Sequence, residues 1–160
     1  MNIYILSGPV HSGKTTALLE FCKNRLNVGG ILSPVLNGKR HFFDIEKQEL
    51  FLMEATAGET NIIQTGKYVF SETAFVRAVE ILQSCVSRNV ELIIIDEVGP
   101  LELRGKGFSE ILRHLLSHLQ KTDILLVVRE NIVDDVIEHF QLPINNIKII
   151  NTLQLPVTLK

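Results

Sequence analysis

The stretch GPVHSGKT at residues 8–15 decides the fold class of this chain. It fits the pattern G-x-x-x-x-G-K-[ST], known as Walker A. The apolar segment NIYILS at 2–7 comes just before it and is typical of a short buried strand. Apolar residues at helical spacing follow over 14–26. Because the pattern stands between a predicted strand and a predicted helix, it has the context that a phosphate-binding loop needs.

The chemistry of this loop suits phosphate. Gly8 and Gly13 permit backbone angles that other residues resist, so that successive N–H groups can point into one concavity and attract an anion. The N-terminus of the next helix adds the positive end of its dipole. Lys14 can reach the β- and γ-phosphates, and Thr15 offers a hydroxyl to Mg²⁺. The residues predicted to bind nucleotide are Gly8, Pro9, Val10, His11, Ser12, Gly13, Lys14, Thr15 and Thr16.

A second stretch, LIIIDEVGPLEL at 92–103, indicates a metal site. The apolar run ELIIID at 91–96 is typical of a strand buried on both faces of a parallel sheet. Asp96 would stand at the carboxyl end of that strand, where open α/β sheets bind their ligands. In phosphate-loop proteins an aspartate in this position holds the Mg²⁺ shell. We therefore predict that Thr15 and Asp96 are the metal residues and that Mg²⁺ is the cofactor.

Three residues are candidates for catalysis: Lys14, Glu97 and Arg129. Glu97 can orient a water, or accept its proton, for in-line attack on the γ-phosphate. The same carboxylate could instead accept the proton of a substrate hydroxyl, which would make the protein a kinase. Arg129 follows the buried run ILLVV. By analogy with phosphate-loop proteins that have adjacent Asp and Glu, that strand would lie between the Asp strand and the loop strand, and Arg129 would stabilise transition-state charge. A surface arginine before a helix cap is the equal alternative.

The rest of the chain alternates strands with helices, which predicts a doubly wound, mostly parallel α/β sheet. HFFDIE and ELFLME, around 41–54, predict an antiparallel hairpin at one sheet edge, with its bend near Lys47 and Gln48. Strands are also predicted at 31–36, 67–70, 123–129 and 147–150, and loops at 55–66 and 99–107. The first helix is expected to end at Gly29 and Gly30, and further helices are expected at 72–87, capped by Ser71, and at 108–119. A last helix is expected to run from an Asn131 cap to about Phe140, with Asp134 as capping partner.

Several segments, taken in order, resemble the small P-loop nucleoside-triphosphatase family, which includes the human cancer-related nucleoside-triphosphatase and thermophile relatives and is sometimes called nucleotide-kinase-like. The segments are GPVHSGKTT, ILSPV with NGKR and HFFDI, GKYVF, and IIIDEVGPLEL, and the resemblance covers roughly residues 3–129. It implies slow, Mg²⁺-dependent hydrolysis of ATP, GTP and other nucleoside triphosphates to the diphosphate. It also implies that Asp96 holds Mg²⁺, that Glu97 is the base, and that Arg40 approaches the nucleotide.

The chain departs from that family pattern in two places. Pro100 and Leu101 stand where other members often have Lys-Met, and the tail after Arg129 does not align. Gly99 and Glu102 match the family's segment after the base. Glu102 could tie this loop down through Arg104 or Lys106, Arg40 could be solvated, and Asn151 and Thr152 could meet the base or sugar.

Composition narrows the class of protein. The 160 residues, with 46% hydrophobic and 21% charged, suit one globular domain over 1–160. The net charge of −2 gives no footprint for nucleic acid or an anionic membrane. Cys22 and Cys85 are expected as buried small hydrophobes, and His114 and His118 as surface residues. A cytoplasmic location is expected, and no protein partner is identified.

The sequence therefore predicts a Mg²⁺-dependent nucleoside-triphosphatase, with nucleoside triphosphates as partners, no nucleic acid and no membrane. Two other functions stay open at this point. One is a nucleotide or small-molecule kinase, in which an acceptor replaces water. The other is a nucleotide-binding switch that regulates a partner protein.

Overall fold

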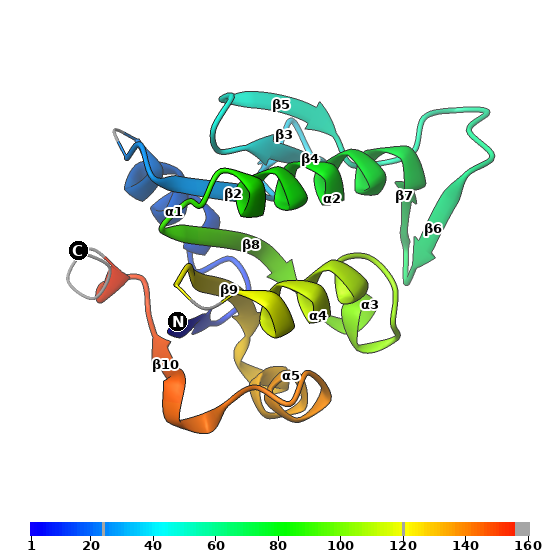
Figure 1. The fold of residues 1–160 in the computed structure, drawn as a ribbon. Coiled ribbons are helices and arrows are strands. Elements are labelled where there is room, and N and C mark those ends of the chain that lie inside the picture. Colours follow the sequence, from blue (N-terminus) through cyan, green and yellow to red (C-terminus); the bar gives the residue numbers. More distant parts are fainter. Residues whose placement is uncertain (24, 120, 156–160) are drawn as a thin grey trace.

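Strand β1 leads directly into the phosphate-binding loop and helix α1 in the computed structural model, which describes residues 1–23, 25–119 and 121–155. Figure 1 shows the chain from the N-terminal strand to the C-terminal turn. The elements in chain order are β1 (Ile3–Gly8), α1 (Lys14–Cys22), β2 (Val28–Leu32), β3 (Val35–Leu36), β4 (Lys39–Asp44), β5 (Glu49–Leu52), β6 (Ile62–Thr65), β7 (Tyr68–Ser71), α2 (Glu72–Ser87), β8 (Leu92–Val98), α3 (Pro100–Leu103), α4 (Ser109–His118), β9 (Asp123–Arg129), η1 (Glu130–Ile132), α5 (Val133–His139), η2 (Ile144–Asn146) and β10 (Ile147–Ile150).

The main sheet has the strand order β10-β1-β9-β8-β2-β4-β3, and β5 pairs with β4. The neighbours from β10 to β2 run parallel, whereas β4 runs antiparallel to β2 and to β5. The predicted fold class and edge hairpin are therefore confirmed. Strand β9 lies between β1 and β8, as the analogy predicted, and its register sets Arg129 beside Gly8.

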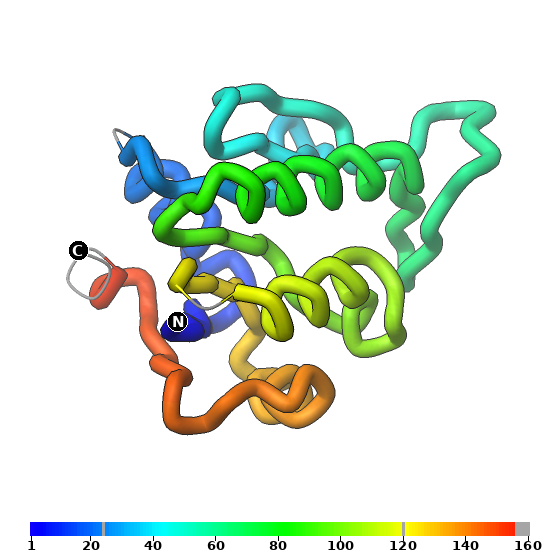
Figure 2. Tube along the Cα trace, viewed as in Figure 1, coloured from blue at the N-terminus to red at the C-terminus, as the bar shows by residue number. Residues whose placement is uncertain are grey.

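Helices cover both faces of this sheet because its strands bury side chains on both sides. Along β1, Ile3 and Ile5 join the core beneath α2, α4 and α5, while Tyr4 and Leu6 join the core beneath α1. In Figure 2 helices α2 and α4 lie on the same face of the sheet, and the β6–β7 hairpin extends outward near α3. Within the described ranges, no helix is both long and apolar enough to cross a bilayer.

The predicted end of the first helix was wrong. Helix α1 ends at Cys22, and Gly29 and Gly30 lie inside strand β2. A Cβ on Gly29 would lie 2.6 Å from Cys85 Sγ, and one on Gly30 would collide with the main chain of Ile94. These glycines therefore serve close packing of β2 against α2 and β8, and they do not stop a helix.

Other local predictions also need correction. The strand predicted at 31–36 is two strands, because β2 ends at Leu32 and β3 takes up Val35–Leu36. The segment 55–66 contains strand β6, which pairs with β7 through Ile62 to Thr65. The segment 99–107 contains the short helix α3. Asn131 caps no helix, because a 3₁₀ turn takes up Glu130–Ile132 and α5 begins after it without a side-chain cap. By contrast, the Ser71 cap is confirmed, since its Oγ accepts a hydrogen bond from Ala74 N at 3.2 Å.

Candidate functional site

The phosphate-binding loop closes around its own lysine. Gly13, at φ 79°, is the N-cap of α1, a left-handed conformation that glycine adopts without strain. Lys14 Nζ donates to the carbonyl oxygens of Gly8 at 2.9 Å and Pro9 at 2.7 Å, and to Ser12 Oγ at 3.2 Å. The ammonium group is thus held in the concavity where the loop sequence predicts phosphate oxygens.

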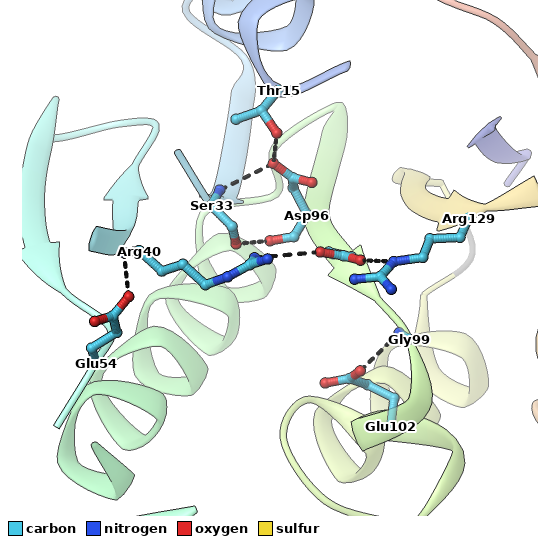
Figure 3. Close-up of polar contacts among 9 residues, drawn as sticks. Thr15, Ser33, Arg40, Glu54, Asp96, Gly99, Glu102 and Arg129 are labelled. Atoms are coloured by element: carbon cyan, nitrogen blue, oxygen red, sulfur yellow. Dashed lines mark hydrogen bonds and ion pairs between the residues drawn. The ribbon is translucent and has the colours of Figure 1, made fainter. Parts of the chain in front are cut away.

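Asp96 is held directly opposite the loop. Its Oδ2 accepts hydrogen bonds from Thr15 Oγ1 at 2.8 Å and from Ser33 N at 3.0 Å, and Ser33 Oγ donates to the Asp96 carbonyl oxygen (Figure 3). The residue is only 2% exposed. Burial raises the pKa of this carboxyl to about 6, although the hydrogen bonds from Ser33 and Thr15 favour the ionised form.

The pair formed by Thr15 and Asp96 fits a magnesium ion. Mg²⁺ takes oxygen ligands, and it is usually bound through one or two protein groups plus water and substrate phosphates. A hydroxyl and a carboxylate at 2.8 Å, beside the loop, are such a set. In the described part of the chain, no group of three or more His, Cys, Asp and Glu residues is placed to hold a metal.

Glu97 lies between two arginines. Its carboxylate accepts from Arg129 Nε at 2.5 Å and lies 3.7 Å from Arg40 Nη1. In Figure 3 Arg40 of β4 and Arg129 of β9 approach from opposite sides the unlabelled carboxylate between them, which their contacts identify as that of Glu97. A bulge after Asp96 shifts the register of β8 against β9. The structure therefore brings together Glu97, Arg129 and Arg40, which are far apart in sequence.

Two cavities meet at this row of charges. One, of about 390 Å³, is lined by residues 10–16 of the loop and by Asp96. The other, of about 430 Å³, is lined by the β6–β7 hairpin, α3 and aromatic side chains. The residues that line both cavities are Ser33, Arg40, Glu97 and Arg129.

Glu102 holds the segment around α3 in place, but its partners are not the two that the sequence suggested. Its carboxylate accepts from Gly99 N at 2.8 Å and Phe108 N at 3.2 Å, and it bonds to neither Arg104 nor Lys106 in the described structure. Arg104 instead donates to Thr65 Oγ1 at 2.8 Å. Burial raises the pKa of Glu102 to about 7. The residue thus ties α3 to the start of α4.

Sequence reasoning missed Ser33 and Tyr68. Ser33 follows β2 at the ligand-binding edge of the sheet, and that position was the available signal. Tyr68 lies under Arg40, whose guanidinium carbon is 4.7 Å from the ring centroid, and no sequence pattern indicates this contact.

Asn151, which the sequence suggested as a contact to the base or sugar, lines neither cavity, and its carboxamide oxygen accepts from Leu153 N at 3.0 Å.

Residues without a proposed role lie as predicted. Cys22 and Cys85 are buried free thiols, and burial raises the pKa of each, to about 12 and about 11. The rings of His114 and His118 stack at 4.2 Å on helix α4. They lie at the molecular surface and line neither cavity.

Comparison with known proteins gives a consistent picture. Residues 3–154 match the model of a family described as NTPase. The nucleoside-triphosphatase THEP1 of Pyrobaculum aerophilum is 28% identical over 138 residues, covering 81% of this chain and 75% of that protein. The nucleoside-triphosphatase THEP1 of Methanopyrus kandleri is 30% identical over 138 residues, covering 79% and 72%.

Two solved structures share the fold. The crystal structure of THEP1 from Aquifex aeolicus superposes with a TM-score of 0.72 at 18% identity, covering 94% of this chain and 89% of that one. The solution structure of a human cancer-related nucleoside triphosphatase gives a TM-score of 0.70 at 21% identity, covering 98% and 95%.

Proposed function

The chain belongs to the NTPase family, matched over residues 3–154, and on that premise we propose that it hydrolyses ATP, GTP and other nucleoside triphosphates to the diphosphate and phosphate with Mg²⁺. It is an enzyme of the nucleoside-triphosphatase class, as its curated relatives are.

The phosphate-binding loop holds the triphosphate in this proposal. The main-chain N–H groups of residues 11–15 and the N-terminus of α1 bind the phosphate oxygens. Lys14 exchanges its bonds to Gly8 and Pro9 for the β- and γ-phosphates, since phosphate oxygens are stronger acceptors for an ammonium group than carbonyl oxygens.

Thr15 and Asp96 would hold Mg²⁺. When bound there, the ion supplies positive charge that offsets the charge building up on the β- and γ-phosphate oxygens. The support is their 2.8 Å contact at the side of the loop and the buried position of Asp96. Ser33 orients the carboxylate from the other side.

Glu97 orients and deprotonates the attacking water. The water oxygen bonds to the γ-phosphorus, its proton passes to the carboxylate, and the diphosphate leaves with the electron pair of the broken bond. Arg129 and Arg40 fix the carboxylate, and their guanidinium groups can stabilise charge on the γ-phosphoryl oxygens. The observation that carries the proposal is this Arg40–Glu97–Arg129 row at the border of the loop cavity.

The proposal extends to domain and location. Residues at the carboxyl ends of β8 and β9, two neighbouring strands of one sheet, line both cavities. This supports one P-loop domain over 1–160. The free thiols of Cys22 and Cys85 are compatible with the reducing cytoplasm, where we propose that the enzyme works.

The test is phosphate release from ATP, GTP, CTP and UTP, each with Mg²⁺ or with EDTA, and with no acceptor added. We expect equal amounts of diphosphate and phosphate with Mg²⁺ and none with EDTA. Thr15→Ala should need more Mg²⁺ for half-maximal turnover. The control Thr73→Ala, exposed and lining neither cavity, should match wild type. Release that persists in EDTA would contradict the metal role, and no release without an acceptor would contradict hydrolysis.

A further inference from the structure

The second cavity lies beside the loop cavity, and no residue of the phosphate-binding loop lines it. Its volume of about 430 Å³ is in the range of sites for small organic ligands. Its apolar wall consists of Met53, Tyr68, Phe70, Phe75, Leu101 and Phe108. Tyr68 and Phe70 stack with centroids 5.8 Å apart, and Phe75 and Phe108 lie 5.3 Å apart. Such a wall suits a planar aromatic ring.

The polar side of this cavity carries an excess of positive charge. Arg40, Lys67, Arg104 and Arg129 line it, against the carboxylates of Glu97 and Glu102. Lys67 and Arg104 are exposed, and neither forms an ion pair with a carboxylate in the parts of the chain that the structure describes. The Arg104 side chain donates to two uncharged oxygens, the Thr65 hydroxyl and the Pro100 carbonyl. These two cations therefore favour an anionic ligand.

The position of the cavity relates it to the reaction. It shares Arg40, Glu97 and Arg129 with the loop cavity, and the loop residues themselves line only the latter. A ligand in the second cavity would thus face the triphosphate across Glu97. The group that can take a proton from water can equally take one from a hydroxyl on this side.

We propose that the second cavity binds a second substrate, a planar aromatic compound that carries an anionic group and a hydroxyl, and that this hydroxyl accepts the γ-phosphoryl group. The hydroxyl oxygen bonds to the γ-phosphorus, its proton passes to Glu97, and the bond to the β-phosphate oxygen breaks. The products are the phosphorylated compound and the nucleoside diphosphate. Water takes the place of the hydroxyl when the cavity holds no acceptor. The transfer rests on the proposed function, because the loop must hold the triphosphate.

Binding is tested first, without nucleotide. The probe is 8-anilinonaphthalene-1-sulfonate, an aromatic anion whose fluorescence rises in apolar surroundings. We expect saturable binding that the double variant Lys67→Glu/Arg104→Glu weakens by about tenfold or more, since two attractive charge pairs become repulsive. Lys106→Glu is the matched control, because Lys106 is exposed on the same loop but does not line the cavity. Equal affinity in the double variant and the control would overturn the site.

Transfer is tested with γ-labelled ATP, Mg²⁺ and the four ribonucleoside 3′-monophosphates, which combine a planar base, an anion and a free 5′-hydroxyl. We expect a labelled nucleoside bisphosphate, and we expect the double variant to lose this product while its acceptor-free phosphate release stays within about twofold of wild type. With the 5′-monophosphates, a labelled diphosphate would overturn the hydroxyl as acceptor. Free phosphate alone with every compound would overturn the transfer. Dye binding without any nucleotide turnover would leave the site standing and refute the proposed function instead.

Discussion

The Glu97 carboxylate lines both cavities, and its contacts with two arginines hold it in that position. A carboxylate that is 27% exposed would rotate among several positions, but Arg129 at 2.5 Å and Arg40 at 3.7 Å restrict it. Arg40 is itself held by the ring of Tyr68 and by the hydrogen bond from its N–H to Glu54 at 2.8 Å. The row is therefore preorganised before substrate binds, which is how charged groups contribute most to catalysis.

Removing Arg129 should slow the reaction more than it weakens binding. We expect Arg129→Ala to lower kcat by ~10²-fold or more, because the guanidinium both orients Glu97 and offsets charge on the γ-phosphoryl oxygens. The measurement is steady-state phosphate release with Mg²⁺-ATP, separated into kcat and KM. Arg113→Ala, which removes an exposed arginine at His139, is the control. A change in KM alone would remove Arg129 from the catalytic step.

The buried carboxyl of Glu102 should make stability depend on pH. Burial raises its pKa from 4.5 to about 7. Between these pH values the unfolded chain releases a proton that the folded chain keeps, so this residue lowers stability as pH rises, by roughly 3 kcal/mol in total. Urea unfolding at pH 5 to 8 should show this fall, and Glu102→Gln should flatten it. An unchanged slope in Glu102→Gln, or an equal flattening in the exposed control Glu110→Gln, would contradict this assignment.

At the scale of elements, the contact between β2 and α2 depends on a missing side chain. The space at Gly29 is closed by Cys85 of α2. We expect Gly29→Ala to destabilise the fold by about 1–3 kcal/mol, the usual cost of overpacking. Cys85→Ala should recover part of that loss in the double variant, because it removes the sulfur that the new methyl group meets. Fully additive losses in chemical denaturation would show that the two sites do not touch.

The elements that sequence reasoning predicted well are those with strong local signals. The parallel strands β8 and β9 are continuous apolar runs, and α2 has both an apolar stripe and a serine cap. The errors arose where tertiary contact decides. Gly29 and Gly30 resemble a helix stop in sequence but are set by neighbouring elements. Likewise Asn131 suits a helix cap, but the turn after Arg129 takes up that residue.

At the scale of the whole molecule, the sheet order determines which residues can meet. Asp96 and the loop were predictable because each has its own motif and both stand at carboxyl ends of parallel strands. The place of Arg129 beside the loop was predictable only by analogy, and the strand order and register agree with that place. The second cavity was not predictable, because it is formed by a hairpin, a short helix and rings brought together from residues 53–108. No repeating pattern in the sequence indicates that these segments come together to form a cavity.

The most direct test of the account is phosphate release by Glu97→Gln with Mg²⁺-ATP, measured beside its nucleotide affinity. Glutamine keeps the size of the side chain but cannot accept the proton. We predict turnover lower by ~10²-fold or more, the usual contribution of a positioned acid–base group, with nucleotide affinity unchanged. Glu110→Gln, a change at an exposed carboxylate that lines neither cavity, should stay near wild type. Turnover by Glu97→Gln equal to that of wild type would contradict the account.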